Sequence, residues 1–336
     1  MWHTLYRRAR QRLNLAGTFG KRAGRGKQRR TRIRGYQLQS VTGWILSFSM
    51  SEVTYLTHKG IFFPMLDDYT ADNLSFVVNE FQLLDDDVVN VAYMKSGTNW
   101  MAEILGLIQH DGDPTWVRST SVFQRTPWLE CVSGLKNALK YPSPRMMNSH
   151  LPVQLFPKSF LNSKAKLVYT LRNPKDVLIS HYYFSKVMKG LKDPGTVQEH
   201  LEEFLSGNVP YGSWFDHVKG WMEMKDRANF FLITYEEMQQ DLRGSVGRIC
   251  HFLGKELNSQ QIDSVVENAS FQKMKDNKMS NFSQVPDMYM DHSKGKLMRK
   301  GISGDWKNLL TVAQSEHFDR VYREKMLGMN MTFPWD

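Results

Sequence analysis

The sequence predicts one α/β domain in residues 50–336, with a mainly parallel central sheet flanked by helices. Short apolar runs of strand length alternate with segments of helical spacing, which is typical of a parallel sheet with helices on both faces. No repeat, low-complexity tract or Pro/Gly/Ser linker divides these residues into two domains. Ligands of such sheets bind outside the carboxyl ends of the strands, so the residues after each strand are the first candidates for chemistry.

Three strand–helix pairs account for this prediction. Each predicted strand is short and rich in β-branched and aromatic residues, which favour strands. Each predicted helix carries apolar residues at intervals of three and four. The pairs are 87–93 with 99–110, 166–171 with 175–188, and 230–234 with 236–253.

Composition narrows the class of protein. With 41% hydrophobic and 23% charged residues, the 336-residue chain is not a collagen, a disulfide scaffold or a wholly disordered protein. No run approaches the roughly 18 consecutive apolar residues of a membrane span, so no membrane association is expected. Cys131 and Cys250 are the only cysteines and predict a reducing, cytoplasmic setting without a zinc site.

The net charge of +10 belongs to the first 49 residues. Residues 1–49 hold 12 of the 44 Lys and Arg residues and no Asp or Glu, which leaves 32 basic against 34 acidic residues in 50–336. We expect a disordered basic leader and no nucleic-acid binding by the domain. A nuclear address, a mitochondrial presequence and a nucleic-acid arm are alternatives for the leader. An upstream extension is favoured, because Met50 opens the compositionally normal part.

The loop after the first predicted strand has the composition of an anion-binding turn. Tyr93-Met94-Lys95-Ser96-Gly97-Thr98-Asn99-Trp100 places small and hydroxylated residues between a strand and a helix. Backbone N–H groups at a helix N-terminus bind phosphate, and Lys95 adds a full positive charge. The loop is P-loop-like but lacks the GxxxxGK[ST] spacing, because its lysine precedes its glycine. A kinase that uses ATP and magnesium is therefore a disfavoured alternative.

Two later segments offer further anion ligands. Arg172 directly follows the second predicted strand, where a guanidinium can bind phosphate through two hydrogen bonds. Ser180, in the next helix, can reach the same anion. Arg299-Lys300-Gly301 combines two cations with a glycine, which lets the backbone approach a ligand closely. Three such segments predict a ligand with more than one phosphate-bearing group.

In combination these segments resemble the cytosolic sulfotransferases, most closely the hydroxysteroid and bile-salt branch. The resemblance covers essentially all of residues 50–336. It rests on Tyr93 to Trp100, Asn148-Ser149-His150-Leu151-Pro152, Arg172 to Ser180, and Arg299 to Asn308. It implies transfer of a sulfuryl group from 3′-phosphoadenosine 5′-phosphosulfate (PAPS) to a hydroxyl of an apolar small molecule, such as a hydroxysteroid or bile acid, with PAP as the product.

The resemblance also implies a donor site. The loop from Lys95 to Trp100 would bind the 5′-phosphosulfate, Trp100 and Tyr235 would contact adenine, and the later segments would hold the 3′-phosphate. The implied donor-binding residues are Lys95, Ser96, Gly97, Thr98, Asn99, Trp100, Arg172, Ser180, Tyr235, Arg299, Lys300 and Gly301.

The implied catalytic residues are His150, Lys95, Lys158 and Asn99. Histidine accepts a proton near neutrality, so His150 would be the base for the acceptor hydroxyl. Lys95 would neutralise the leaving oxygen, Lys158 would position the transferring group, and Asn99 would bond sulfuryl oxygens. No metal is required, because Lys and Arg supply the positive charge.

Acceptor and partner are implied in the same way. Trp128, Phe184 and Met188, with His150, would form the apolar acceptor site. The 19 methionines suit a site for more than one rigid ring system. A homodimer is implied by a short motif that contains Lys307, Thr311, Val312 and Glu316. The alternative is an ordinary surface segment that opens a helix at Thr311.

Two positions depart from the family pattern. Met94 stands where the family has proline, which would loosen the placement of Lys95. Ala269 stands where the family has Ser or Thr, which would remove one hydrogen bond to the nucleotide. Both favour weaker donor binding. A protein that binds PAPS or PAP with little or no turnover is therefore the second hypothesis.

Overall fold

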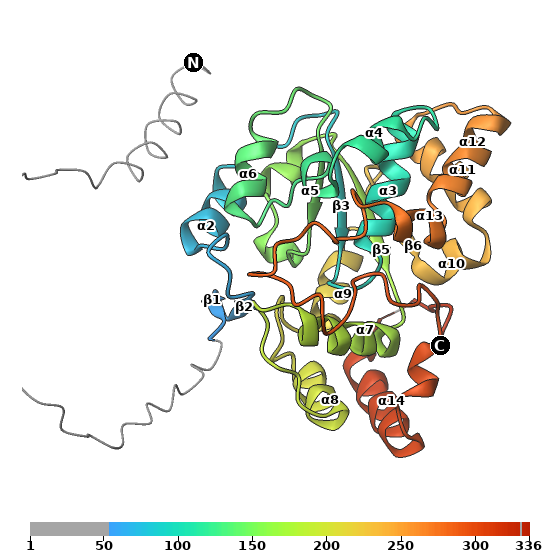
Figure 1. Ribbon diagram of the computed structural model, residues 1–336. Helices are drawn as coiled ribbons and strands as arrows, with labels where there is room; N and C mark the ends of the chain where they lie inside the picture. Colours follow the sequence, from blue (N-terminus) through green and yellow to red (C-terminus); the bar gives the residue numbers. More distant parts are fainter. Residues whose placement is uncertain (1–53, 330) are drawn as a thin grey trace, which may run out of the picture. The chain divides into compact units, whose positions relative to one another are not determined.

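A computed structural model describes residues 54–329 and 331–336, so the predicted leader, residues 1–49, lies outside the described part of the chain. The described residues form a central parallel sheet with helices packed around it (Figure 1). Its strands are β3 (Val88–Ala92), β4 (Met146–Ser149), β5 (Lys166–Leu171) and β6 (Phe230–Thr234). Their order in space is β4-β3-β5-β6, and every neighbouring pair is parallel. The predicted α/β fold is confirmed.

Helices and short 3₁₀ turns connect the strands, and an antiparallel hairpin, β1 (Leu56–His58) with β2 (Ile61–Phe63), precedes them. The helices are α2 (Ala71–Asn79), α3 (Thr98–Gln109), α4 (Thr115–Ser119), α5 (Val122–Arg125), α6 (Val132–Ala138), α7 (Pro174–Val187), α8 (Val197–Ser206), α9 (Trp214–Met222), α10 (Tyr235–Gln240), α11 (Leu242–Leu253), α12 (Ser259–Asn268), α13 (Phe271–Asp276) and α14 (Val312–Met326). The 3₁₀ turns are η1 (Val153–Leu155), η2 (Lys158–Asn162) and η3 (Asp305–Asn308). Within the described residues, no helix combines the length and the apolar character needed to cross a bilayer.

The structure differs from the predicted elements in two places. The helix predicted over 236–253 is two helices, α10 and α11, which meet at Asp241. Asp241 has φ −144°, and its carboxylate accepts the backbone N–H of Gly244, so it caps a new helix. The apolar spacing continues across this break, because Met238 and Leu242 are four residues apart. Strand β4 is absent from the predicted elements, since half of its residues are polar although all are buried.

The strands divide the apolar core into two layers. Alternate residues of a strand point to opposite faces of the sheet. Leu167 and Tyr169 of β5 belong to the larger cluster, which includes residues of α2, α7, α9 and α14. Val168 belongs to the smaller cluster, which includes residues of α3, α11 and α12. Burial on both faces holds the strands in register, so their carboxyl ends lie side by side.

Candidate active site

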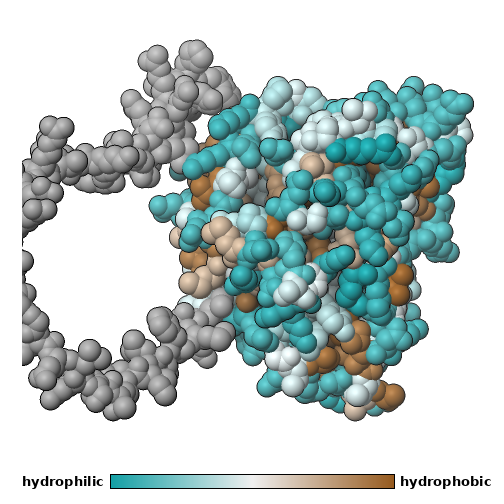
Figure 2. Space-filling model, in the orientation of Figure 1, coloured by the Kyte–Doolittle hydropathy of each residue, from teal (hydrophilic) through white to brown (hydrophobic). Residues whose placement is uncertain are grey.

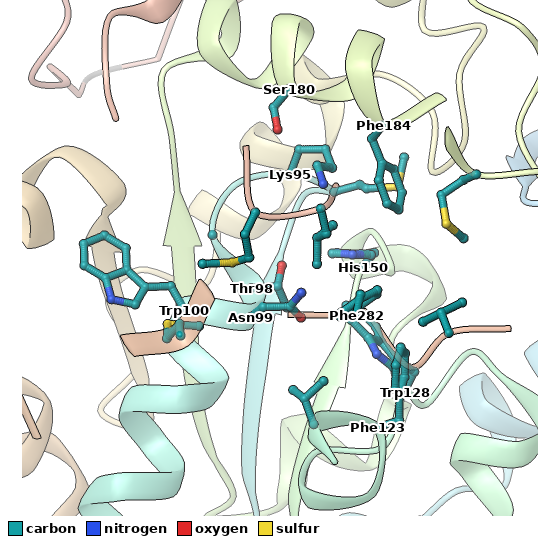
Figure 3. A pocket seen from close by; sticks show the side chains of 18 of the residues that line it. Lys95, Thr98, Asn99, Trp100, Phe123, Trp128, His150, Ser180, Phe184 and Phe282 are labelled. Carbon is teal, nitrogen blue, oxygen red and sulfur yellow. The ribbon is translucent and has the colours of Figure 1, made fainter. Parts of the chain in front are cut away.

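The carboxyl ends of three neighbouring strands deliver predicted site residues to one place. The loop after β3 carries Lys95, His150 directly follows β4, and Arg172 directly follows β5. All three line one cavity of about 960 Å³. Figure 3 shows Lys95 and His150 in this cavity. Parallel pairing keeps these strand ends level, because β3 is in register with both of its neighbours.

All but two of the predicted site residues line this cavity, the exceptions being Ser96 and Lys158. Ser96, in the loop after β3, is fully buried, and its hydroxyl has no partner among the described residues. The residues that do line the cavity are Lys95, Gly97, Thr98, Asn99, Trp100, Trp128, His150, Arg172, Ser180, Phe184, Met188, Tyr235, Arg299, Lys300 and Gly301.

The position of Lys158 does not support its predicted role. Lys158 lies on η2, outside the cavity lining, and its Nζ donates a hydrogen bond to Oδ1 of Asn79 at 2.9 Å. After β4 the chain must return to the amino ends of the strands before it can begin β5 in parallel. The adjacent Ser159 bonds the carbonyl of Phe81 and the backbone N–H of Leu83, which precede β3, so Lys158 lies near the amino ends of the strands.

The loop between β3 and α3 has the backbone geometry of an anion cradle. Lys95 has φ +74° and Gly97 has φ +109°, a left-handed conformation that suits glycine and is uncommon for lysine. A Cβ atom at Gly97 would lie 2.8 Å from Cδ2 of Tyr235, so a side chain does not fit. As the N-cap of α3, Gly97 offers no side chain to the first turn, which leaves backbone N–H groups for a ligand.

Lys95 and Arg172 form a positively charged end of the cavity. The Arg172 guanidinium donates to the carbonyls of Lys95 at 3.1 Å and Ile302 at 3.0 Å, and it lies 4.2 Å from the Tyr235 ring centroid. Burial, together with the charges of Arg172 and Arg299, lowers the pKa of Lys95 to about 7. A bound anion would offset this and favour the charged amine.

Arg299 and Lys300 both pair with the buried carboxylate of Asp305. Arg299 Nη1 lies 2.7 Å from Oδ2, and Lys300 Nζ lies 2.6 Å from Oδ1. Burial raises the pKa of Asp305, but the hydrogen bonds from Lys300 and Arg299 outweigh it and lower the pKa to about 2. Gly301 has φ +67°, and a Cβ atom there would overlap the Phe271 ring. Asp305 therefore holds both cations of this loop close to its backbone.

Buried polar atoms at this end of the cavity lack partners among the described residues. They are Oγ of Ser96, Oγ1 of Thr98 and Nε of Arg172. Buried polar groups without a partner are rare, so such a cluster beside several cations marks a place for a ligand. Hydroxyls, a guanidinium, amines and a helix N-terminus suit a ligand that carries phosphate and sulfate groups. These residues therefore fit the predicted donor, PAPS.

Aromatic rings adjoin the charged end. The indole N–H of Trp100 donates to the carbonyl of Ala269 at 2.8 Å, and its ring lies 5.0 Å from the Tyr235 ring. In contrast to the prediction, the Ala269 side chain is fully buried and does not line the cavity, so position 269 contributes through its carbonyl. Met94 is 5% exposed and packs into the larger core cluster, which restrains this loop position without a proline ring.

His150 lies at the carboxyl end of β4 and is nearly buried. Its Nδ1 lies 2.6 Å from the carbonyl oxygen of Ala92, and its ring contacts those of Trp128 and Tyr211, with centroids 4.4 and 5.0 Å away. A carbonyl only accepts, so Nδ1 carries the proton and Nε2 has a free lone pair. Burial is the main cause that lowers the pKa of His150 to about 3, so the ring is neutral.

Apolar side chains form the other end of the cavity. Figure 3 shows Trp128, Phe123 and Phe282 on the side of His150 that lies away from Trp100. The rings of Phe123 and Phe282 are 4.7 Å apart. Phe184 lies under Lys95, whose Nζ is 3.8 Å from the ring centroid, so the apolar and charged ends meet there.

Sequence reasoning missed three buried residues that organise the site: Glu130, Asp176 and His217. Glu130 Oε1 accepts the backbone N–H of His150 at 2.8 Å, and His217 contacts the His150 carbonyl at 3.2 Å. The Asp176 carboxylate accepts the backbone N–H of Gly304 at 2.6 Å, which fixes the loop that carries Arg299 and Lys300. Only Asp176 had a local signal, because Asp is favoured in the first turn of a helix.

Within residues 54–329 and 331–336, no three His, Cys, Asp or Glu side chains come together as possible ligands of a metal ion.

Comparisons with known proteins point to one family. A family model described as a sulfotransferase domain matches residues 85–330. Sulfotransferase 2B1 of Mus musculus is 55% identical over 282 residues, which cover 84% of this chain and 83% of that protein.

Two further comparisons agree. The 3-beta-hydroxysteroid sulfotransferase of Cavia porcellus is 46% identical over 288 residues, which cover 85% of this chain and 99% of that protein. The crystal structure of mouse sulfotransferase SULT7A1 complexed with PAP has a TM-score of 0.69 at 31% identity. That match covers 82% of this chain and 95% of the SULT7A1 chain.

Proposed function

Because this chain belongs to the sulfotransferase family, we propose that it transfers the sulfuryl group of PAPS to a hydroxyl of a hydroxysteroid. The relative named 3-beta-hydroxysteroid sulfotransferase supports the acceptor class, and the related structure complexed with PAP supports the donor. Transfer to bile acids is a narrower proposal, supported by the apolar end of the cavity.

One observation carries this proposal: a single cavity joins an anion-binding end to an apolar end, and both Lys95 and His150 line it. When bound, PAPS supplies a sulfuryl group attached to a phosphate that can leave. The donor would be held by the loop after β3, by the aromatic rings of Trp100 and Tyr235, and by three segments that bear cations or hydroxyls. These residues are Lys95, Ser96, Gly97, Thr98, Asn99, Trp100, Arg172, Ser180, Tyr235, Arg299, Lys300 and Gly301.

His150 would accept the proton of the attacking hydroxyl at Nε2, whose lone pair is free because Nδ1–H donates to Ala92. Lys95 would stabilise the negative charge that develops on the departing phosphate oxygen. Asn99 would donate a hydrogen bond to the sulfuryl oxygens. Lys158 has no part in this proposal, because it lies outside the cavity.

The acceptor would lie against Trp128, Phe184 and Met188, which are half-buried and line the cavity. Burial of a steroid ring system against such side chains contributes roughly 25 cal/mol for each Å² of apolar surface removed from water. The hydroxyl would then face His150, whose ring lies beside Trp128.

We further propose a homodimer through Lys307, Thr311, Val312 and Glu316, and a cytoplasmic setting. Val312, at the start of α14, is 75% exposed, and an exposed valine is suited to a small apolar contact. One hydrophobic area lies low on the face in Figure 2, where Figure 1 draws α8 and α14. The free thiols of Cys131 and Cys250 support the cytoplasmic setting.

The test is sulfate transfer from radiolabelled PAPS by the full chain to a 3β-hydroxysteroid, a bile acid and a simple phenol. Transfer to the steroid, with a turnover loss of roughly 10²- to 10⁴-fold in His150→Ala, is the expected result. Transfer only to the phenol would contradict the acceptor class. PAP binding by the folded protein without transfer to any acceptor would favour the binding-protein hypothesis.

A further inference from the structure

His150 lies just beyond the end of β4, where the ladder of the sheet no longer satisfies its backbone. A buried N–H or carbonyl in such a place needs another partner. The N–H of His150 donates to Glu130 Oε1 at 2.8 Å, and the His150 carbonyl lies 3.2 Å from Nε2 of His217. Side chains therefore replace the missing strand on both sides of this residue.

Helix α9 supplies one side of this arrangement. His217 and Trp221 are four residues apart and so lie on the same face of α9. His217 contacts the carbonyl of His150, and the Trp221 indole N–H donates to the next carbonyl, that of Leu151, at 3.1 Å. Both side chains are buried, with 1% exposure at His217 and none at Trp221. One helix face thus holds two successive peptide groups of the segment that carries His150.

The protonation of His217 follows from its partners. A carbonyl oxygen only accepts hydrogen bonds, so Nε2 of His217 carries the proton. Its Nδ1 is then free to accept from the Tyr169 hydroxyl, which lies 2.9 Å away on β5. Burial lowers the pKa of His217 to about 3, so this arrangement does not change near neutral pH.

Glu130 holds the backbone N–H of His150, on the side opposite its carbonyl. Its side chain is fully buried, and the segment around it is fixed by Asn73, whose side-chain amide donates to the carbonyls of Glu130 at 2.9 Å and Leu129 at 3.3 Å. The other carboxylate oxygen of Glu130, Oε2, has no hydrogen-bond partner among the described residues. The carboxyl group therefore bonds the His150 backbone through one oxygen only.

We propose that His217 and Glu130 are positioning residues, which hold the peptide groups on either side of His150 so that its free Nε2 faces the cavity. The inference rests on the proposed base role of His150. Neither side chain lines the cavity, so each would act through His150 and not on the substrate. A displacement of about 1 Å in a reacting group can cost about 10²-fold in rate, which sets the scale of the effect.

The first test compares His217→Leu with His217→Gln in the full chain. Gln retains an N–H donor and an oxygen acceptor, whereas Leu retains neither. We expect His217→Leu to lose roughly 10- to 100-fold in kcat, with the KM for the steroid and the affinity for PAP changed less than about three-fold. His217→Gln should recover most of the lost kcat. His200→Leu removes another buried histidine, on α8, and serves as the control, with kcat within about three-fold of wild type.

A double-mutant cycle separates positioning from general damage. In a His150→Ala background the base is absent, so His217→Leu should cause no further loss of the residual turnover. The same fold loss in both backgrounds would overturn the proposal while leaving the base role intact. Near-normal turnover of His150→Ala itself would instead overturn the base role of the proposed function, and the positioning proposal with it.

A spectroscopic readout tests the same point without turnover. Long-range ¹⁵N–¹H NMR of the His150 ring reports which nitrogen carries the proton. Wild type and His217→Gln should show protonated Nδ1 and free Nε2, whereas His217→Leu and Glu130→Leu should show a changed tautomer ratio or ring environment. An unchanged His150 signal in both leucine variants would overturn the proposal.

Discussion

The lowered pKa of Lys95 predicts that donor-type nucleotides bind with uptake of a proton. Burial and the neighbouring charges of Arg172 and Arg299 bring the pKa of this amine to about 7 in the free protein. A bound nucleotide adds phosphate charges that favour the protonated amine. Its pKa should then return toward the ordinary value of about 10.4. PAP is the suitable probe, because it binds without reacting.

The size of the uptake follows from these two pKa values. At pH 8 an amine with a pKa of about 7 is roughly 10% protonated, and one with a pKa near 10 is almost fully protonated, so binding should take up about 0.9 proton. At pH 6 the amine is already about 90% protonated in the free protein, so the uptake by Lys95 falls to about 0.1. Uptake should therefore rise from pH 6 to pH 8.

Calorimetric titration of PAP in buffers of different ionisation enthalpy measures this uptake. Lys95→Met keeps the apolar stem and removes the charge, so its uptake at pH 8 should be near zero. Equal uptake by wild type and Lys95→Met at pH 8 would refute the reasoning.

Stability provides a second measurement on the same variant. The pKa of Lys95 is lower in the folded than in the unfolded protein, so the buried charged amine destabilises the folded state. This destabilisation is complete below about pH 7 and is relieved as the pH rises toward 10.4. Lys95→Met should accordingly have a higher Tm than wild type at pH 6, and the difference should shrink at pH 9.

Three further predictions concern the donor loops and the proposed dimer. Gly97→Ala must place a side chain at φ +109°, against the ring of Tyr235. The left-handed strain of about 1–2 kcal/mol predicts that a titration will show PAP binding roughly 5- to 30-fold weaker than in wild type. An affinity within two-fold of wild type would contradict this. The Asp305 carboxylate has a folded pKa of about 2, below its unfolded value near 3.9, so its stabilising contribution is present above pH 4 and lost as the pH falls through 2. Asp305→Asn should therefore lower Tm at pH 7 and lose less on acidification than wild type, and a parallel Tm-against-pH curve would argue against this role. Val312→Asp should shift light scattering at micromolar concentration from dimer to monomer, whereas a wild type that is already monomeric would exclude the proposed dimer.

Much of the fold was predictable because its signals are local. Strands β5 and β6 have the predicted bounds, and α3 and α7 begin within one residue of theirs. The start of α14 was also predicted, since Thr311 is an N-cap whose hydroxyl accepts the backbone N–H of Gln314. Strand β4 escaped prediction, because its polar Asn148 is satisfied by Asn90, 58 residues away, through a hydrogen bond that no local pattern indicates.

The same distinction applies to the site. Motifs at the ends of strands and in one glycine-containing loop identified the residues that line the cavity, because parallel strands bring their carboxyl ends together. The predicted role of Lys158 is not supported by its position, because that position depends on the path of the return connection between β4 and β5, which its neighbours in the sequence do not encode.

By itself, then, the sequence determined the α/β class, and it predicted an anion site from three loops with a histidine beside them. Only the tertiary structure decided that Asp305 pairs with Arg299 and Lys300 and that α9 lies against the segment of His150. It also decided that burial and neighbouring cations lower the pKa of Lys95. The physical reason is the separation of the contacting residues along the sequence. Helix and strand patterns arise between residues a few positions apart, whereas His150 and His217 are 67 residues apart. Such contacts follow from the order of the strands and the packing of helices on the sheet.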